Sequence, residues 1–340
     1  MKHLQLFSKK HRDSLLNKRK GETKFGERLT LLGNITNIYD ALKDLDVEYV
    51  IFGISESIGV FANHGKSGTE DTWEATIKFL LNIQNNDFIQ SNKVVVLGHL
   101  DYDGQLETIK NTHKSEKKQV QSARQFVEEI DKDVSHIVYS IIKAGKTPII
   151  IGGGHNNAYG NLKGSALALN QQISAINFDA HTDFRTEEGR HSGNGFSYAY
   201  AEGFLNRYMV FGLHENYTSK NIFKKLDKLQ CADYISYEAI SIRKDISFNK
   251  ALNRSEKFMG KDYFGIELDC DTMQNVPSSA MTPNGFTTKQ ARRFVHHFGM
   301  QKKAVYLHIC EAIPTGAYNV GKLITYLVTD FIKAKQHANR

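Results

Sequence analysis

Short apolar runs alternate along the chain with segments in which apolar residues recur at helical spacing. Continuous runs of this length, bounded by Gly or polar residues, are typical of strands that are buried on both faces of a parallel sheet. The predicted strands cover residues 47–52, 93–97, 147–151, 173–178, 263–268 and 304–310.

The segments between these strands are predicted to be helical. In 119–144 a single apolar stripe runs along the helix, and Gly145 is placed to end it in the left-handed conformation. The stripe is formed by Phe126, Ile130, Val134, Ile137, Val138, Ile141 and Ile142. Further helices are predicted at 70–82, 162–170, 289–298 and 321–335. This alternation indicates right-handed βαβ units, and therefore an α/β fold with a central, mostly parallel sheet.

The length of the chain and its lack of a linker favour one large domain. The 340 residues include only four prolines and no Gly/Ser-rich tract, so we expect no flexible connection between domains. We predict a single α/β domain over residues 46–340. Residues 1–45 are predicted to be an amino-terminal arm that is partly ordered or lies against a neighbouring subunit.

Composition excludes several classes of function. The net charge of +7 comes from basic residues that are interleaved with acids, and no nucleic-acid-binding motif is present, so we expect no nucleic-acid partner. No apolar run approaches the roughly 18 residues that span a bilayer. The chain starts with too short an apolar stretch for a signal peptide, and its three cysteines are widely spaced, as in a reducing compartment. We expect a cytoplasmic protein without membrane contact.

Polar residues with metal-binding side chains follow four of the predicted strands. His155 follows 147–151 after three glycines, and Glu311 follows 304–310. The other candidates come directly after 173–178 and 263–268 and are Asp179, His181, Asp183, Asp269 and Asp271. In open α/β sheets, ligands bind outside the carboxyl ends of the strands. These side chains are therefore predicted to form one site.

The alternate spacing of these residues predicts convergence if the strand ends stay extended, since residues i, i+2 and i+4 then share a face. Carboxylate and imidazole donors without thiolate suit Mn, Zn or Fe better than a structural zinc site. Two such metals polarise a substrate and generate hydroxide from water near neutral pH. The pattern therefore indicates a binuclear metal hydrolase.

The same motifs resemble those of the arginase (ureohydrolase) superfamily, and most of all its formimidoylglutamase branch. The resemblance covers roughly residues 50 to 335. The metal motifs that carry it are Gly152-Gly153-Gly154-His155, Asp179-Ala180-His181-Thr182-Asp183, Asp269-Cys270-Asp271 and Glu311-Ala312-Ile313-Pro314. The segments that point to the branch are Gly59 to Gly68, Asp183-Phe184-Arg185 and His191-Ser192-Gly193-Asn194-Gly195-Phe196.

The resemblance implies a three-layer αβα fold, two Mn²⁺ ions and a small amidino or guanidino amino acid as substrate, with Fe and Zn as alternative metals and a homo-oligomeric assembly. One metal would take His155, Asp179, Asp183 and Asp269, and the other Asp179, His181, Asp269 and Asp271. The two shared aspartates would bridge.

At the substrate end, the resemblance implies that Asp183 passes a proton to the leaving amine and that Glu311 faces the amidinium group. Arg185 would grip a carboxylate of the substrate, and Ser192 and Asn194 would lie beside it. Arg185 could instead pair with Glu187 or Glu188.

Three functions stay open. Ser192 stands where arginases and agmatinases usually carry a proton-shuttling histidine, which favours hydrolysis of N-formimidoyl-L-glutamate to L-glutamate and formamide. His191, one position away, could be a displaced shuttle. The alternatives are hydrolysis of another guanidino compound and a non-catalytic metal-binding member of the family.

Overall fold

The computed structural model describes residues 2–316 and 318–338. Its centre is one ten-stranded sheet with the order β1-β4-β3-β5-β10-β9-β6-β7-β8, in which β2 also pairs with β4. Only β1 is antiparallel to its neighbour among these strand pairs. The strands are β1 (Leu4–Leu6), β2 (Thr30–Leu31), β3 (Tyr49–Ser55), β4 (Val94–Asp101), β5 (Thr147–Ile151), β6 (Ile173–Phe178), β7 (Leu205–Leu213), β8 (Ala232–Ser236), β9 (Phe264–Asp269) and β10 (Ala304–Cys310).

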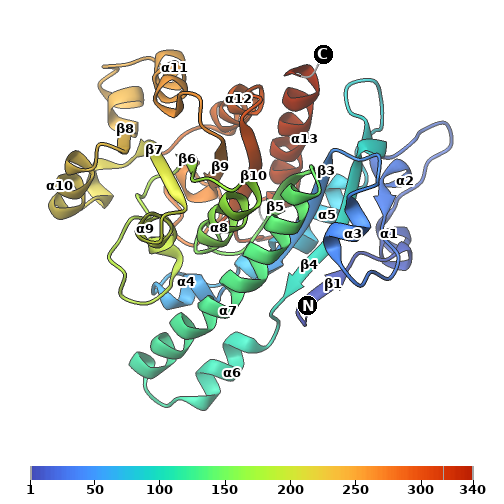
Figure 1. Cartoon of the computed structure of the whole chain (residues 1–340), viewed down its shortest axis with the longest axis horizontal. Helices are drawn as coiled ribbons and strands as arrows, with labels where there is room; N and C mark the ends of the chain where they lie inside the picture. The colour runs from blue at the N-terminus through green and yellow to red at the C-terminus, as the bar shows by residue number, and fades with distance from the viewer. Residues whose placement is uncertain (1, 317, 339–340) are drawn as a thin grey trace.

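Helices cover both faces of the sheet, which gives the three layers that were predicted (Figure 1). Helices α3, α4, α7, α8 and α9 pack on one face, and α5, α11, α12 and α13 on the other. The helices are α1 (Lys9–Leu15), α2 (Phe25–Arg28), α3 (Ile38–Leu42), α4 (Ile58–Ala62), α5 (Thr72–Leu80), α6 (Gln105–Thr112), α7 (Glu116–Lys143), α8 (Asn157–Leu169), α9 (Gly195–Ala201), α10 (Lys220–Lys228), α11 (Phe248–Met259), α12 (Thr288–Gly299) and α13 (Val320–Ala338).

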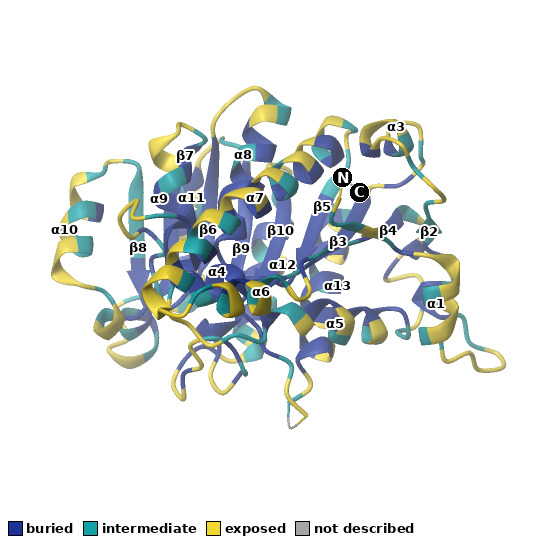
Figure 2. Cartoon of the chain, turned by 90° about the horizontal axis from the view of Figure 1, so that it is seen from below, coloured by how far each residue is buried: buried dark blue, intermediate teal, exposed yellow. Residues whose placement is uncertain are grey.

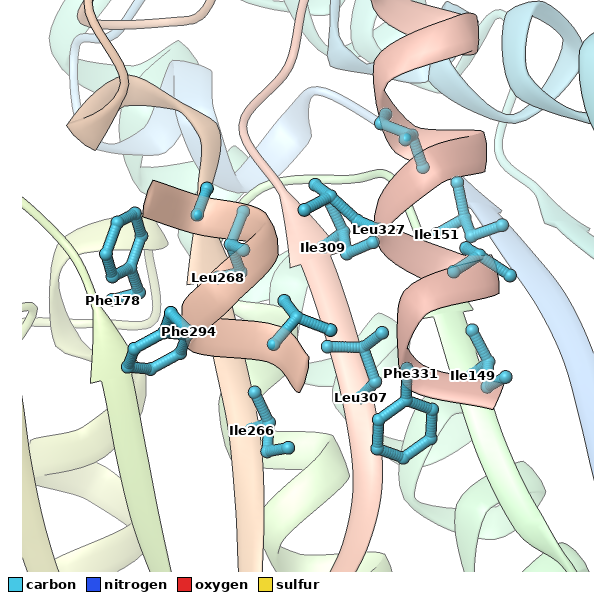
Figure 3. Packing of buried hydrophobic residues seen from close by; sticks show 14 of the residues in the cluster. Ile149, Ile151, Phe178, Ile266, Leu268, Phe294, Leu307, Ile309, Leu327 and Phe331 are labelled. Atoms are coloured by element: carbon cyan, nitrogen blue, oxygen red, sulfur yellow. The ribbon is translucent and has the colours of Figure 1, made fainter. Parts of the chain in front are cut away.

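The central strands are buried on both faces, as their continuous apolar runs predict. In β5, Ile149 and Ile151 face α13 while Ile150 faces the α7 side, and all three are fully buried. Figure 3 shows the core on the α13 side of the sheet, where Phe331 and Leu327 of α13 pack against the strands. Figure 2 shows the resulting pattern, with buried strands inside and exposed residues on the outer sides of the helices.

The strand predictions at 147–151, 173–178 and 304–310 match β5, β6 and β10, and 263–268 differs from β9 by one residue at each end. Strands β3 and β4 continue past the predicted ends at 52 and 97, through Gly53 and Gly98. A Cβ atom at Gly53 would lie 2.4 Å from the Trp73 ring, so this glycine makes room for α5 inside a strand. Glycine therefore interrupts the apolar pattern here without ending the strand.

The predicted helices are also present, with shifted boundaries. Helix α7 begins at an N-cap, Ser115, and the N–H of Gly145 donates to the Ile142 carbonyl beyond its end. Residues 69–71 form a 3₁₀ turn ahead of α5, so the helix predicted from 70 begins at Thr72. Helix α8 begins at Asn157 and not at 162, because polar contacts of Asn157 with the preceding loop fix this end.

The segment predicted to be an arm contributes to the sheet edge of its own chain. Strand β1 pairs with β4, and Phe7, Phe25 and Leu29 are buried. The division of the chain into an arm and one domain stays a prediction, as does contact of the arm with a neighbouring subunit. Among the described residues, no helix has the length and apolarity needed to cross a membrane.

Candidate metal centre

The candidate site lies at the carboxyl ends of β5, β10, β9 and β6, which are neighbours in that order in the sheet. Strand β6 ends directly before Asp179, β9 ends at Asp269, and β10 ends directly before Glu311. Strand β5 ends before the loop that carries His155. Parallel pairing aligns the ends, so residues distant in sequence reach one edge. The prediction that these polar clusters follow buried strands is confirmed.

A glycine loop brings His155 from the end of β5 into the site. Gly152 and Gly153 have φ of 91° and 72°, values that residues with a Cβ rarely adopt. The buried carboxylate of Glu56 accepts hydrogen bonds from the Gly154 N–H at 2.8 Å and from the Asn157 side-chain amide at 2.8 Å. The loop is therefore held by a carboxylate from the end of β3, which sequence reasoning did not identify.

The metal-ligand candidates converge, but the chain does not stay extended after the strands, which was the condition given for this convergence. Strand β6 ends at Phe178, Asp183 has φ of 42°, and residues 270–272 form a 3₁₀ turn. The Asp179 side chain accepts from the His181 N–H at 2.7 Å, and Asp269 accepts from the Asp271 N–H at 2.8 Å. These local carboxylate-to-backbone bonds turn the chain, and the turns bring the side chains together.

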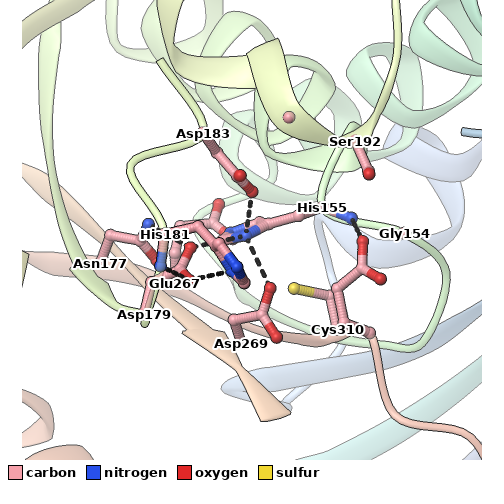
Figure 4. A network of polar contacts seen from close by, with 12 residues as sticks. Gly154, His155, Asn177, Asp179, His181, Asp183, Ser192, Glu267, Asp269 and Cys310 are labelled. Atoms are coloured by element: carbon pink, nitrogen blue, oxygen red, sulfur yellow. Dashed lines mark hydrogen bonds and ion pairs between the residues drawn. The ribbon is translucent and has the colours of Figure 1, made fainter. Parts of the chain in front are cut away.

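Two groups of donors result. Nδ1 of His155 lies 2.8 Å from an oxygen of Asp183, 3.2 Å from one of Asp179 and 3.3 Å from one of Asp269. Figure 4 shows Asp183 and Asp269 approaching this ring from opposite sides. Nδ1 of His181 lies 3.0 Å from Asp271 and 3.6 Å from Asp179. Both groups are compact enough to hold a metal ion, and Asp179 belongs to both.

The donors fit a cation better than they fit one another. Nδ1 of His155 and Oδ1 of Asp271 are buried and have no hydrogen-bond partner among the described residues. Burial, together with the charges of Asp271 and Asp179, raises the pKa of Asp269 well above its ordinary value. Burial and the Asp179 charge raise the pKa of Asp183 to about 6. Four clustered carboxylates with two imidazoles form a donor set suited to Mn, Fe or Zn.

A cavity of about 600 Å³ opens above these donors. Buried Glu311 lines this cavity, has φ of 61°, and accepts the backbone N–H of His155 through Oε1 at 2.7 Å. Burial raises the pKa of Glu311 to about 8. A cationic ligand would stabilise the charged form of this buried carboxylate, because an opposite charge offsets the cost of its burial.

Arg185, Asn63 and Ser192 also line the cavity. Asn63 joins the other two, since its oxygen accepts from Arg185 at 2.7 Å and its amide donates to Ser192 Oγ at 3.1 Å. Arg185 also pairs with Glu188 at 3.0 Å. Both roles considered for Arg185 are thus compatible with its position, because one guanidinium has five N–H donors.

Asn194 and His191 do not line this cavity. The Asn194 oxygen accepts from buried Arg190 at 2.6 Å, and its amide donates to the Gly189 carbonyl at 2.8 Å. Nδ1 of His191 accepts from the Gly193 N–H, and burial lowers the pKa of this ring to about 3. These contacts hold the loop that carries Ser192, so they favour neither substrate contact for Asn194 nor a displaced shuttle at His191.

Two further side chains reach the site without a signal in the sequence. Tyr217 stacks on His181 with ring centroids 5.4 Å apart and forms one wall of the cavity. Cys310, the last residue of β10, lies close enough to His155 and His308 for the three to share an ion. All three cysteines are free thiols.

Comparison with known proteins supports the resemblance. The family model described as the arginase family matches residues 48–330. A formimidoylglutamase of Streptococcus gordonii is 22% identical over 277 residues, which cover 79% of this chain and 78% of that protein. A formimidoylglutamase of Streptococcus pyogenes serotype M12 is 24% identical over 275 residues, covering 78% of this chain and 77% of that one.

Solved structures share the fold. A crystal structure of Trypanosoma cruzi formiminoglutamase with Mn²⁺₂ aligns with a TM-score of 0.73 at 18% identity, covering 94% of this chain and 99% of that one. Formimidoylglutamase of Bacillus subtilis aligns with a TM-score of 0.74 at 15% identity, covering 95% of each chain. Because the family model spans most of its length, this protein belongs to the arginase family.

Proposed function

We propose that this protein is a binuclear manganese hydrolase that converts N-formimidoyl-L-glutamate and water to L-glutamate and formamide. Membership of the arginase family supports hydrolysis, and relatives named formimidoylglutamase support the substrate. The T. cruzi relative crystallised with Mn²⁺ supports the metal. The single observation that carries the proposal is the convergence of His155, His181 and four aspartates beside a cavity that Glu311 also lines.

The donors divide between the two metals through shared aspartates. His155, Asp179, Asp183 and Asp269 would hold one ion, and Asp179, His181, Asp269 and Asp271 the other. When bound, two Mn²⁺ ions supply Lewis-acid activation of water and of the amidine carbon. Asp179 and Asp269 each have two carboxylate oxygens, which allows them to serve both ions.

The chain's own residues position the substrate and move the proton. Glu311 would accept N–H groups of the amidinium, and this charge-assisted contact would orient the electrophilic carbon above the metal donors. Arg185, aimed by Asn63, would bind a glutamate carboxylate in the bidentate geometry that guanidinium favours. Ser192, on the other side of Asn63, would contribute a hydroxyl to the same wall.

Asp183 is placed to complete the reaction. When water adds to the amidine carbon and the bond to the glutamate nitrogen breaks, that nitrogen must gain a proton before glutamate leaves. Asp183 lines the cavity and its carboxyl is partly exposed there, so it is the acid best placed to deliver this proton.

The decisive experiment compares turnover of formiminoglutamate, arginine, agmatine and guanidinobutyrate by one manganese-loaded sample with its metal content determined. Formamide and glutamate from formiminoglutamate alone are the expected products. If urea formed from a guanidino compound, the proposed metal mechanism would stand and the proposed substrate would be wrong. Two bound metals without any turnover would favour a non-catalytic metal-binding protein.

A further inference from the structure

A buried polar cluster lies beneath the candidate metal centre, on the side of His155 away from the aspartates. Glu267 of β9 and His308 of β10 are directly opposite each other in the sheet register, and both are fully buried. Nδ1 of His308 lies 2.6 Å from Oε2 of Glu267, and the Tyr306 hydroxyl donates to Oε1 at 2.7 Å. The Glu267 carboxylate is thus fixed in position from two sides.

Burying a charged carboxylate between two strands is costly unless its partners compensate. The sequence makes room for this cluster, because a Cβ atom at Gly265 would lie 2.0 Å from the Tyr306 ring. No described lysine or arginine pairs with Glu267. A buried carboxylate that contacts histidines and no described lysine or arginine, directly under a candidate ligand, points to a role in the site.

Glu267 faces the second nitrogen of His155. Nε2 of His155 is fully buried and has no aligned hydrogen-bond partner among the described residues. Oε2 of Glu267 lies 3.5 Å from this nitrogen. The other nitrogen, Nδ1, faces the aspartates of the metal centre. A histidine that binds metal through one nitrogen commonly donates its other N–H to a carboxylate, which fixes both tautomer and ring orientation.

We propose that Glu267 is a positioning residue that accepts the Nε2–H of His155 and so directs the Nδ1 lone pair toward the metal, while His308 and Tyr306 hold Glu267 in place. His308 also contacts the Gly152 carbonyl at 3.3 Å, which ties the cluster to the loop that carries His155. This inference rests on the metal centre of the proposed function. It adds three residues that lie outside the ligand set and outside the cavity.

The variant Glu267→Gln keeps the size of the side chain but leaves one acceptor oxygen for the four donors of His155, His308, Tyr306 and Asn161. We expect metal affinity to fall about 10- to 100-fold at the site that contains His155, as is usual when such a partner is lost. The site that contains His181 should be affected less, so calorimetric titration with Mn²⁺ should show one tight ion in place of two. Asp262→Asn is the matched control, because this carboxylate also accepts two side-chain hydrogen bonds, from Ser174 and Asn206, but precedes β9 at the end of the strand opposite Asp269; two tight ions should remain.

A second readout uses the wild-type protein and depends on no variant. In zinc-loaded, ¹⁵N-histidine-labelled protein, His155 should show a hydrogen-bonded proton on Nε2, assigned by its loss in His155→Asn. A proton on Nδ1, or unchanged binding of two ions by folded Glu267→Gln, would overturn the positioning role and leave the proposed function intact. A wild-type protein that binds no second ion would overturn both.

Discussion

The backbone N–H of His155 donates to Glu311 Oε1 at 2.7 Å, so a candidate metal ligand and the candidate amidinium-binding carboxylate share one contact. The two residues follow β5 and β10, which are neighbouring strands paired in parallel. Gly154 allows this approach, since a Cβ atom there would lie 2.5 Å from the Asn156 side chain. The metal end and the substrate end of the site are therefore built as one unit.

Asp179 and Asp271 should differ in their effect on metal content. Asp179 contacts both histidines, whereas the Asp271 carboxylate is paired with His181 and not with His155. We expect Asp179→Asn to lose both metals and Asp271→Asn to lose one. Elemental analysis after dialysis measures this. If Asp179→Asn kept two metals, the bridging assignment would be wrong.

Arg185→Ala should raise KM for a carboxylated substrate, by about 10-fold or more for the loss of one charge-assisted contact worth roughly 1.5–3 kcal/mol. Metal content should stay the same, because Arg185 contacts Asn63 and Glu188 and no candidate ligand. Arg254→Ala is a matched control, since its side chain is equally exposed and pairs with Asp233 away from the cavity. Equal kinetics for the two variants would remove Arg185 from the substrate site.

Glu56→Gln should destabilise the fold, because the buried carboxylate accepts from the N–H groups of Gly154 and Gly59 and from the Asn157 amide. Since bonds to a charged acceptor contribute about 1.5–3 kcal/mol, we expect the free energy of unfolding to fall by about 2–3 kcal/mol. Urea denaturation measures the change. Glu107→Gln, which removes an exposed pair with Lys110, should change it by less than about 1 kcal/mol. Similar losses in both variants would contradict the role assigned to Glu56.

Lys335 predicts a pH dependence of stability far from the site. Burial lowers the pKa of Lys335 to about 8, below the ordinary 10.5. The folded state therefore disfavours the charged form of Lys335. The resulting loss of stability is complete below about pH 8 and disappears as the pH rises toward 10.5, the pKa of lysine in the unfolded chain. We expect Lys335→Met to be more stable than wild type by about 1–3 kcal/mol at pH 7, with the gain shrinking by pH 10. Urea denaturation at both pH values checks this, and a gain independent of pH would contradict it.

The sequence predicted the four strands β5, β6, β9 and β10 whose carboxyl ends carry the site, because continuous apolar runs and the polar residues after them are local features. It did not predict how the ligands converge, since the turns at Asp179 and Asp269 depend on side-chain bonds to nearby backbone. Strands β1, β2, β7 and β8 were not predicted.

Residues that act only through tertiary contacts carry no local signal. Glu56 meets Gly154 across 98 residues of sequence, and Asn63 meets Arg185 across 122. Substrate contact by Asn194, which its place in a family motif suggested, stays a prediction, and the hydrogen bonds of its side chain lie within its own loop. The homo-oligomer and the cytoplasmic location stay predictions.

Electron paramagnetic resonance of the manganese-loaded protein shows whether Asp179 and Asp269 bridge a pair of metals. We predict uptake of two Mn²⁺ per chain and the spectrum of an exchange-coupled pair, with Asp271→Asn reverting to the hyperfine-resolved signal of an isolated Mn²⁺. An isolated-ion spectrum from fully loaded wild-type protein would contradict the account.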